Sequence, residues 1–257
     1  MNKQELSTDQ LSRYSRHLLL PEIDLEGQAR LQSSSALLIG AGGLGTPAAM
    51  YLASSGVGEI TIFDHDEVDL GNLQRQVAYG SADIGQPKAA QLKKRLLEIN
   101  PETRITAVRQ KADRHTLLSV MRNVDIVIDA CDNFDTRFAI NEASLTTSTP
   151  LVSGAAIRFA GQVSVFDPRP KNAPCYRCLY NEDEDTYRSN CSDRGVFAPL
   201  VGIIGSILAA EAIKILLHIG RPLAGKLLQL DTKTMTPRIT TLLKDPQCPA
   251  CGHTQYR

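Results

Sequence analysis

The sequence predicts an α/β fold in which a doubly wound, mostly parallel sheet carries helices on both faces. Up to about residue 154, short apolar runs of strand length alternate with helix-length segments, as in parallel sheets. A Gly-x-Gly-x-x-Gly loop directly follows the first of these runs and opens a helix. Two Cys-x-x-Cys pairs in the last third of the chain add a predicted metal site.

Five apolar runs predict the parallel strands. Each is short, rich in Ile, Leu or Val, and bounded by polar residues or glycine, which is typical of strands buried on both faces. They are Ala36 to Ile39, Glu59 to Phe63, Ile105 to Val108, Val124 to Ile128 and Leu151 to Ser153.

The segments between these strands predict helices. Leu92, Leu96 and Ile99 recur at helical spacing, and Gly56 ends the helix before them. The expected helices run from Thr8 or Asp9 to about Leu20, Leu44 to Ser55, Pro87 to Ile99, Thr116 to Met121 and Asp135 to Thr147. Residues 64–76 have neither helical nor strand periodicity, so we expect a long polar loop there.

After about residue 154 the pattern changes to that of antiparallel strands. Residues 161–166 alternate, as strands with one solvated face do. A long apolar helix from about Ala198 to Ile219 follows, and then two more strands, Leu227 to Leu230 and Arg238 to Leu243. We therefore expect a single continuous unit with a C-terminal antiparallel extension.

The composition excludes some classes of partner. The chain has 257 residues, 42% of them hydrophobic and 22% charged, and its 28 basic side chains balance 28 acidic ones. Zero net charge argues against a general binder of nucleic acid or of anionic membranes, because both need a cationic excess. Any polyanion must therefore be held by a few well-placed cations.

No secretory or membrane-spanning segment is expected. The first ten residues are polar, which does not fit a signal peptide. The longest apolar run, Val196 to Ala210, has 15 residues and contains Pro199. A membrane span needs ~20 apolar residues, so the run favours a buried helix. Six cysteines without a leader indicate a reducing compartment, for which we expect the cytoplasm.

The glycine loop predicts a nucleotide site. Gly40, Gly42 and Gly45 let the backbone approach a phosphate, and the following helix offers unpaired N–H groups and the positive end of its dipole. Asp64, 19 residues past Gly45, ends the second strand and can accept hydrogen bonds from a ribose hydroxyl. The same geometry suits NAD, FAD or ATP, and a purely structural turn is the plainer alternative.

Two cations near the loop favour a triphosphate. The guanidinium fork of Arg75, in the polar segment, suits phosphate oxygens, although a solvated surface arginine is the ordinary alternative. Lys88 follows Pro87 in the first turn of a helix. The helix dipole disfavours a cation there, so this lysine fits a site that also holds an anion.

A carboxylate lies at the end of the fourth predicted strand. Asp132 and Asn133 come directly after it, where open α/β sheets bind ligands. Either residue can simply cap the next helix. Beside a triphosphate, Asp132 is also a candidate Mg²⁺ ligand.

The cysteine pairs predict a structural zinc site. Cys175 and Cys178 form one pair and Cys248 and Cys251 the other, with 69 residues between them. Four thiolates complete a tetrahedral shell and leave no position for a catalytic water. A disulfide or redox pair is disfavoured, because neither pair is expected to open a helix after a strand. Cys191, after an acidic run, is either a nucleophile or an unreactive surface thiol.

Ordered motifs extend along nearly the whole chain. They are Arg13-Tyr14-Ser15-Arg16, the loop Gly40 to Gly45, Asn72-Leu73-Gln74-Arg75-Gln76, Gly85-Gln86-Pro87-Lys88, Asp132-Asn133, Pro150 to Ala156, both cysteine pairs and Ala198 to Gly202. Together they resemble the MoeB/ThiF family, the bacterial relatives of ubiquitin-activating enzymes. The resemblance implies one adenylation domain over residues 1–257, divided into three parts. These are an N-terminal arm (1–30), a Rossmann-like nucleotide-binding part (31–154) and a carrier-binding, zinc-containing part (155–257).

The resemblance also implies an activity, ATP-dependent adenylyl transfer. The substrate would be the C-terminal glycine of a small ubiquitin-fold sulfur carrier of the MoaD or ThiS kind, ending in Gly-Gly. Its carboxylate would attack the α-phosphate of ATP and give an acyl-adenylate and pyrophosphate, for later sulfur transfer in molybdopterin or thiamine biosynthesis. Sulfur would come from a separate protein, because no sulfurtransferase domain is expected after Cys251.

Five residues would hold the nucleotide if this resemblance carries over. Gly43 and Asp64 would contact its adenosine part. Asn72, Arg75 and Lys88 would hold its phosphates.

Three further residues would act beside them. Asp132 would bind Mg²⁺, and Arg16 would reach the active site of the neighbouring subunit of a homodimer. Cys191 would be the thiol that joins the carrier during sulfur transfer.

Two other functions stay open from the sequence. The glycine loop and Asp64 also fit a nicotinamide-dependent oxidoreductase, which the cationic segment from Asn72 to Lys88 and the zinc site disfavour. The chain can also be a scaffold that binds the carrier without activating it.

Overall fold

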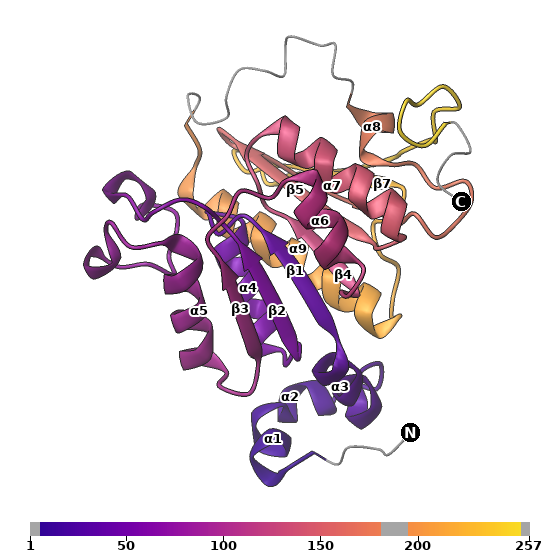
Figure 1. The fold of residues 1–257 in the computed structure, drawn as a ribbon. Helices are drawn as coiled ribbons and strands as arrows, with labels where there is room; N and C mark the ends of the chain where they lie inside the picture. Colours follow the sequence, from indigo (N-terminus) through magenta and orange to yellow (C-terminus); the bar gives the residue numbers. More distant parts are fainter. Residues whose placement is uncertain (1–5, 181–194, 253–257) are drawn as a thin grey trace.

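The structure, a computed structural model, describes residues 6–180 and 195–252 and is built around one eight-stranded sheet (Figure 1). The strand order is β3-β2-β1-β4-β5-β6-β7-β8. Their bounds are β1 (Ser35–Ile39), β2 (Glu59–Phe63), β3 (Arg104–Val108), β4 (Ile126–Asp129), β5 (Leu151–Ile157), β6 (Ala160–Phe166), β7 (Lys226–Asp231) and β8 (Thr236–Thr241). Neighbours from β3 to β5 are parallel and those from β5 to β8 antiparallel, so the predicted fold class is confirmed.

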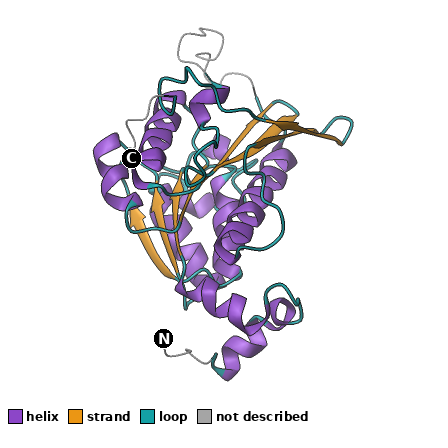
Figure 2. Cartoon of the chain, turned by 90° about the vertical axis from the view of Figure 1, so that its right-hand side faces the viewer, coloured by secondary structure: helices purple, strands orange, loops and turns teal. Residues whose placement is uncertain are grey.

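Helices cover both faces of the sheet (Figure 2). Their bounds are α1 (Thr8–Arg13), α2 (Ser15–Leu18), α3 (Asp24–Ser33), α4 (Gly45–Ser54), α5 (Lys88–Ile99), α6 (Arg114–Met121), α7 (Phe134–Thr147), α8 (Tyr176–Leu179) and α9 (Ala198–Leu217). Helices α3, α4, α5 and α9 share one apolar core with the sheet. Helices α6 and α7 share a second core on the opposite face.

Strand β1 shows why the parallel strands are apolar throughout. Leu38 belongs to the core under α4 and α9, whereas Leu37 belongs to the core under α6 and α7, and neither is exposed. Because successive side chains point to opposite faces, a strand covered on both sides needs apolar residues at both. Each such leucine contributes about 1.5–3 kcal/mol relative to an exposed one.

Helix α9 crosses the core on one face of the sheet. Among the described residues, it alone is long and apolar enough to cross a membrane by length and composition. Within the fold, 61% of its most apolar stretch is buried, and it packs against α4, β5 and β6. The prediction of a buried helix is therefore confirmed.

The N-terminal region differs from the prediction. The expected single helix is two helices, because the backbone of Tyr14 leaves helical geometry and its buried hydroxyl accepts a hydrogen bond from Asn100 Nδ2 at 2.9 Å. Helix α3 was not predicted. Its Gln28 is fully buried and donates to the carbonyl of Ser55, whereas Leu25 is exposed, so the apolar spacing of a helix is missing.

Candidate nucleotide site and cysteine cluster

A cavity of about 360 Å³ lies at the carboxyl ends of β1, β2 and β4. Gly40 follows β1, Asp64 follows β2 and Ala130 follows β4, and all three line it. The chain runs outward from β1 through β2 to β3 and then returns to β4 on the other side of β1. The cavity therefore lies at the topological switch point, where open α/β sheets bind ligands.

The glycine loop forms one wall of this cavity, and two of its glycines are sterically required. Gly40 has a φ of 96°, and a Cβ there would lie 2.7 Å from the carbonyl oxygen of Ala130. A Cβ on Gly45 would lie 1.9 Å from the carbonyl oxygen of Gly40. Gly42 and Gly43 line the cavity, whereas Gly45 shapes the turn behind it.

Asp64 faces the cavity and also braces the loop. Its Oδ2 accepts from the N–H of Ala41 at 2.7 Å, and its Oδ1 accepts from the N–H of Asp66 at 2.8 Å. Burial raises the pKa of Asp64, although the two hydrogen bonds and the nearby Lys88 work in the opposite direction. The carboxylate has lone pairs left for a ligand hydroxyl.

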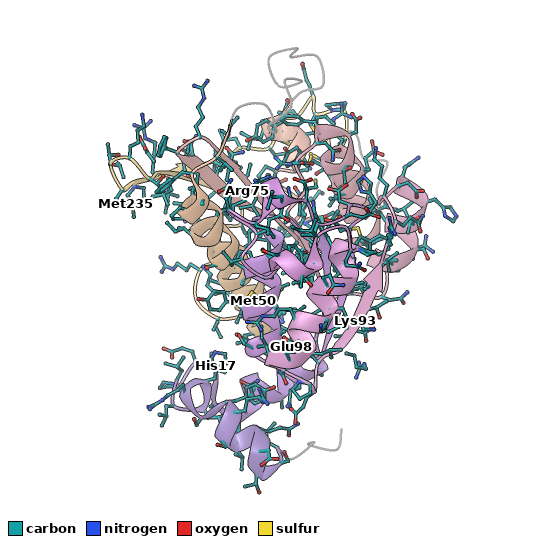
Figure 3. The ribbon with its side chains drawn as sticks, turned by 90° about the vertical axis from the view of Figure 1, so that its left-hand side faces the viewer. His17, Met50, Arg75, Lys93, Glu98 and Met235 are labelled. Atoms are coloured by element: carbon teal, nitrogen blue, oxygen red, sulfur yellow. The ribbon has the colours of Figure 1, made fainter. Side chains whose placement is uncertain are left out.

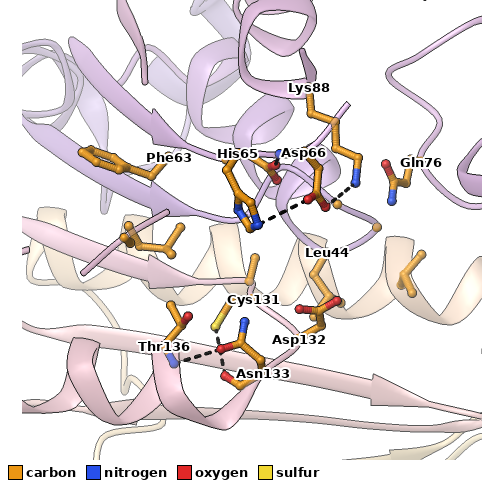
Figure 4. A pocket seen from close by; sticks show the side chains of 18 of the residues that line it. Leu44, Phe63, His65, Asp66, Gln76, Lys88, Cys131, Asp132, Asn133 and Thr136 are labelled. Carbon is orange, nitrogen blue, oxygen red and sulfur yellow. Dashed lines mark hydrogen bonds and ion pairs between the residues drawn. The ribbon is translucent and has the colours of Figure 1, made fainter. Parts of the chain in front are cut away.

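Lys88 is buried at the cavity wall and is held by a second carboxylate (Figure 4). Its Nζ lies 3.0 Å from Oδ2 of Asp66, and its backbone N–H donates to the carbonyl of the same residue. The sequence predicts an anion beside Lys88. The carboxylate of Asp66 provides part of this negative charge, so the protein itself supplies it in part. The other oxygen of Asp66 lies 3.5 Å from Nε2 of His65.

The polar loop brings Asn72 and Arg75 to the same cavity. A short 3₁₀ turn, η1 (Leu70–Asn72), begins at Asp69, whose carboxylate accepts from the N–H of Gly71. Arg75 is half-buried, and its Nη1 donates to the carbonyl of Gly71 at 3.0 Å. One hydrogen bond leaves most of the guanidinium donors of Arg75 available to a ligand.

The two roles considered for Asp132 and Asn133, helix capping and Mg²⁺ binding, fall to different residues. Oδ1 of Asn133 accepts from the N–H of Thr136 at 2.9 Å, so Asn133 is the N-cap of α7. Asp132 is exposed at the cavity, and within the described residues no hydrogen bond or ion pair holds its carboxylate. A carboxylate oxygen is the donor type that Mg²⁺ takes.

The cavity also includes residues that sequence reasoning missed, chiefly His65, Gln76 and Arg137. Gln76 is 3% exposed, and its Oε1 has no hydrogen-bond partner in the described part of the chain. Arg137 is 6% exposed and lies among the buried residues of α7, together with Phe138 and Asn141. Burial alone would lower the pKa of Arg137, but the carboxylate of Asp129 raises it well above its usual value.

Cys131 is a packed thiol. Burial, together with the charge of Asp129, raises its pKa well above the usual value. The thiol donates to Oδ1 of Asp129 at 2.8 Å. A protonated, hydrogen-bonded thiol is a poor nucleophile.

The four paired cysteines meet in one cluster, although the pairs are far apart in the sequence. Sγ of Cys175 lies 3.7 Å from that of Cys248, and Sγ of Cys178 lies 3.4 Å from that of Cys251. Four thiolates around zinc at 2.3 Å would lie about 3.8 Å apart. A disulfide would need about 2.05 Å between sulfurs. The cluster can therefore hold zinc.

The first cysteine pair does open a helix, contrary to the prediction, because Cys175 caps the short helix α8. The hydrogen bond between the thiols of Cys178 and Cys175, followed by those from the backbone N–H groups of Asp245 and Cys175, lowers the pKa of Cys178 to about 5. The grouping of four sulfurs, rather than the absence of a helix, is what favours zinc.

Arg16 is not brought to the cavity of its own chain. Arg16 is exposed on α2, which packs on α3 at the end of the sheet where β1 begins. Figure 3 shows Arg75 in the upper part of the molecule and His17, the neighbour of Arg16, on the N-terminal helices below it. Cys191 lies outside the described residues.

Comparison with known proteins places the chain in a family. The ThiF family profile matches residues 14–250. The chain belongs to the ThiF family. The resemblance found in its motifs is thereby confirmed.

Three relatives match this chain over nearly its full length. The sulfur carrier protein adenylyltransferase of Thermus thermophilus is 42% identical over 248 residues, which cover 95% of this chain and 92% of that one. The molybdopterin-synthase adenylyltransferase of Salmonella typhimurium is 43% identical over 251 residues, covering 96% and 99%. The sulfur carrier protein ThiS adenylyltransferase of Escherichia coli is 43% identical over 240 residues, covering 93% and 94%.

Solved structures of a more distant protein share the fold. The crystal structure of E. coli MccB with ATP matches with a TM-score of 0.81 at 25% identity. It covers 98% of this chain and 75% of that chain.

Proposed function

We propose that this chain adenylates the C-terminal glycine of a small ubiquitin-fold sulfur carrier at the expense of ATP. One observation carries the proposal. A single cavity at the switch point collects the glycine loop, Asn72, Arg75, Lys88 and Asp132. The names of the 42–43% identical relatives support the same activity.

The reaction joins two anions, so positive charge must be in place beforehand. An oxygen of the carrier's terminal carboxylate forms a bond to the α-phosphorus. The bond from that phosphorus to the oxygen bridging to the β-phosphate breaks, and pyrophosphate leaves with the electron pair. Arg75 and Lys88 offset the repulsion between carboxylate and triphosphate and stabilise the charge that develops on the leaving group.

No side-chain base or nucleophile is needed for this step. The carrier's carboxylate is already ionised near pH 7. Cys131, the thiol that lines the cavity, is protonated and hydrogen-bonded to Asp129. Cys191 takes no part in adenylation and enters only in later sulfur transfer, with sulfur from a separate protein.

Asp132 would hold Mg²⁺ beside the phosphates. The fit rests on its exposed carboxylate at the cavity, which no described residue engages. Bound there, Mg²⁺ would neutralise phosphate charge.

A second copy of the chain would complete the site. Arg16 is exposed and lies at the other end of β1 from the cavity, so it can act only on the cavity of another subunit. Leu19 and Leu20, close to it, are 71% and 47% exposed. Exposed apolar side chains of this kind fit a contact between copies in a homodimer.

The antiparallel part would bind the carrier. Val196 lines the cavity, and the next residue, Phe197, stacks on Phe159 at the surface with ring centroids 5.2 Å apart. Ile239 in β8 and Met235 in the turn between β7 and β8 are 60% and 63% exposed. We propose that these exposed apolar side chains contact the carrier and that its C-terminal tail reaches the cavity beside Val196.

Mass measurement of the carrier tests the proposal. The purified protein is incubated with ATP, magnesium and either a MoaD-type or a ThiS-type carrier ending in Gly-Gly. We expect one of the two carriers to gain the mass of AMP. If a carrier binds but gains no AMP, the chain is instead a scaffold that binds the carrier without activating it. Titration that favours NAD over ATP by a wide margin would indicate the oxidoreductase.

We also expect this reaction to take place in the cytoplasm, where the cysteine pairs stay reduced. The identity of the adenylated carrier assigns the pathway, molybdopterin or thiamine biosynthesis.

A further inference from the structure

A buried chain of hydrogen bonds runs from the cysteine cluster to the nucleotide cavity. It begins at Asn141 on α7, which is 1% exposed. Nδ2 of Asn141 lies 3.7 Å from Sγ of Cys175, and its Oδ1 accepts from the N–H of Tyr176 at 2.9 Å. One asparagine thus orients both a metal-ligand candidate and the residue after it.

Tyr176 is held rigidly between the two sites. It is 2% exposed, and its ring makes edge contacts with Phe138 and Phe166 at centroid distances of 5.9 and 5.6 Å. Its hydroxyl accepts from Nη1 of Arg137 at 3.3 Å. Because the ring is fixed on two sides, the hydroxyl of Tyr176 is held at the guanidinium of Arg137.

Arg137 joins the ends of two neighbouring strands. Its Nη2 donates to the carbonyl of Cys131, two residues past the end of β4, at 2.7 Å and to the carbonyl of Gly154, in β5, at 3.0 Å. Asp129, in β4, also links this strand to β5, because its Oδ2 accepts from Ser153 Oγ at 2.6 Å. The guanidinium and this carboxylate are 3.8 Å apart, so the buried charge of Arg137 is paired.

The carbonyls that Arg137 holds belong to the walls of the cavity. Cys131 directly precedes Asp132, and Gly154 directly precedes Ala155, and both following residues line the cavity. A shift of the guanidinium would therefore move the proposed Mg²⁺ ligand and the opposite wall together. In catalysis such shifts matter, because displacement by about 1 Å can cost 10²-fold in rate.

We propose that Arg137 is a positioning residue for the nucleotide cavity and that Tyr176 ties it to the cysteine cluster. The cluster then does more than staple two segments, since it sets the position of Asp132 through three buried side chains. This inference rests on the proposed function for its consequence, ATP binding, but its geometry can be tested without it.

The test uses the full-length protein purified with its metal. Tyr176→Phe deletes the hydroxyl and keeps the buried ring. Thr149→Val is the matched control, because it also deletes a buried hydroxyl, one that donates to the carbonyl of Met121 away from the cavity. Amide hydrogen exchange, ATP binding and metal content are measured for both variants and the wild type.

We expect Tyr176→Phe to speed exchange at residues 131–133 and 154–156 and to leave metal content unchanged. Its Kd for ATP should rise roughly threefold to tenfold, the range of one net hydrogen bond. Thr149→Val should alter neither readout. The proposed relay is the link from the cysteine cluster through Tyr176 and Arg137 to the cavity. If amide exchange at both segments is unchanged in Tyr176→Phe, the relay is wrong, whatever the result for ATP binding.

A second variant tests whether Tyr176 acts through Arg137. Arg137→Lys keeps the charge but not the fork that reaches two carbonyls and the hydroxyl. If the relay is correct, adding Tyr176→Phe to Arg137→Lys raises the Kd no further, because coupled residues are not additive. Independent, multiplying effects would contradict it. If the wild type binds no ATP, the proposed function is wrong. Amide hydrogen exchange would then still show whether Tyr176 and Arg137 link the cysteine cluster to the cavity.

Discussion

The nucleotide cavity and the cysteine cluster are built in opposite ways. The cavity is assembled from side chains at three strand ends and a long loop, and Arg75 and Asp132 keep most of their polar atoms unengaged. In the cluster, Cys175 and Cys248 are buried, and all four sulfurs lie within 4.8 Å of one another. The cavity is arranged to receive charge from outside, whereas the cluster is closed on itself. We therefore expect changes in the cavity to affect activity and changes in the cluster to affect stability first.

The sharpest way to break the cavity is Arg75→Ala. Because the guanidinium would stabilise developing phosphate charge and holds only one carbonyl, adenylate formation should fall about 10²–10³-fold with no change in melting temperature. Activity is measured as the mass gained by the carrier. The matched control Arg104→Ala should keep full activity, since Arg104 pairs with Glu59 at the far end of the sheet. Equal activity of Arg75→Ala and wild type would remove Arg75 from the mechanism.

Mixed dimers sharpen the statement that the cavity is completed from another copy. Arg16→Ala and Asp132→Ala should each be inactive alone. A heterodimer of the two has one site with both groups intact, so activity should return in part. Verified heterodimers that stay as inactive as their parents would exclude the trans-acting arginine.

Cys248→Ser breaks the cluster. Cys248 is fully buried, and losing one of four thiolates should release the metal and lower the melting temperature by roughly 10 °C or more. Metal analysis should find about one zinc per wild-type chain. Cys131→Ser, another buried cysteine outside the cluster, should keep its zinc. Retention of metal and melting temperature by Cys248→Ser would contradict a four-cysteine site.

The smallest expected effect concerns pH. Burial raises the pKa of Asp64, so the folded state binds its proton more tightly than the unfolded state does. The stability of the wild type relative to Asp64→Asn should then be greatest near the ordinary Asp pKa of about 3.9 and fall as pH rises through the raised value. Denaturant unfolding from pH 4 to 7 measures this. A relative stability that rises with pH would contradict the assignment.

Most of the parallel sheet could be predicted, because its strands are buried on both faces and read as continuous apolar runs. Helix α3 could not, since its buried position 28 is a glutamine satisfied by a distant carbonyl. The N-terminal helix was predicted as one because only the tertiary bond to Asn100 explains why Tyr14 interrupts it.

The site shows a similar division. The glycine loop, Arg75, Lys88 and Asp132 could be found from motifs and strand ends, and the structure brings them to one cavity. Arg137 could not, because α7 also carries charged residues that face solvent, and only the contacts with Asp129 and Tyr176 distinguish the buried arginine from these. His65 lines the cavity through the turn after β2, which no periodicity indicates.

Exchange of labelled pyrophosphate into ATP tests the central claim most directly, because it reports reversal of the bond made at the α-phosphate. The account predicts exchange that requires both magnesium and a carrier ending in Gly-Gly, and that disappears when the carrier's last glycine is removed. Exchange that proceeds equally well without any carrier, or fails with every Gly-Gly carrier that binds, would contradict it.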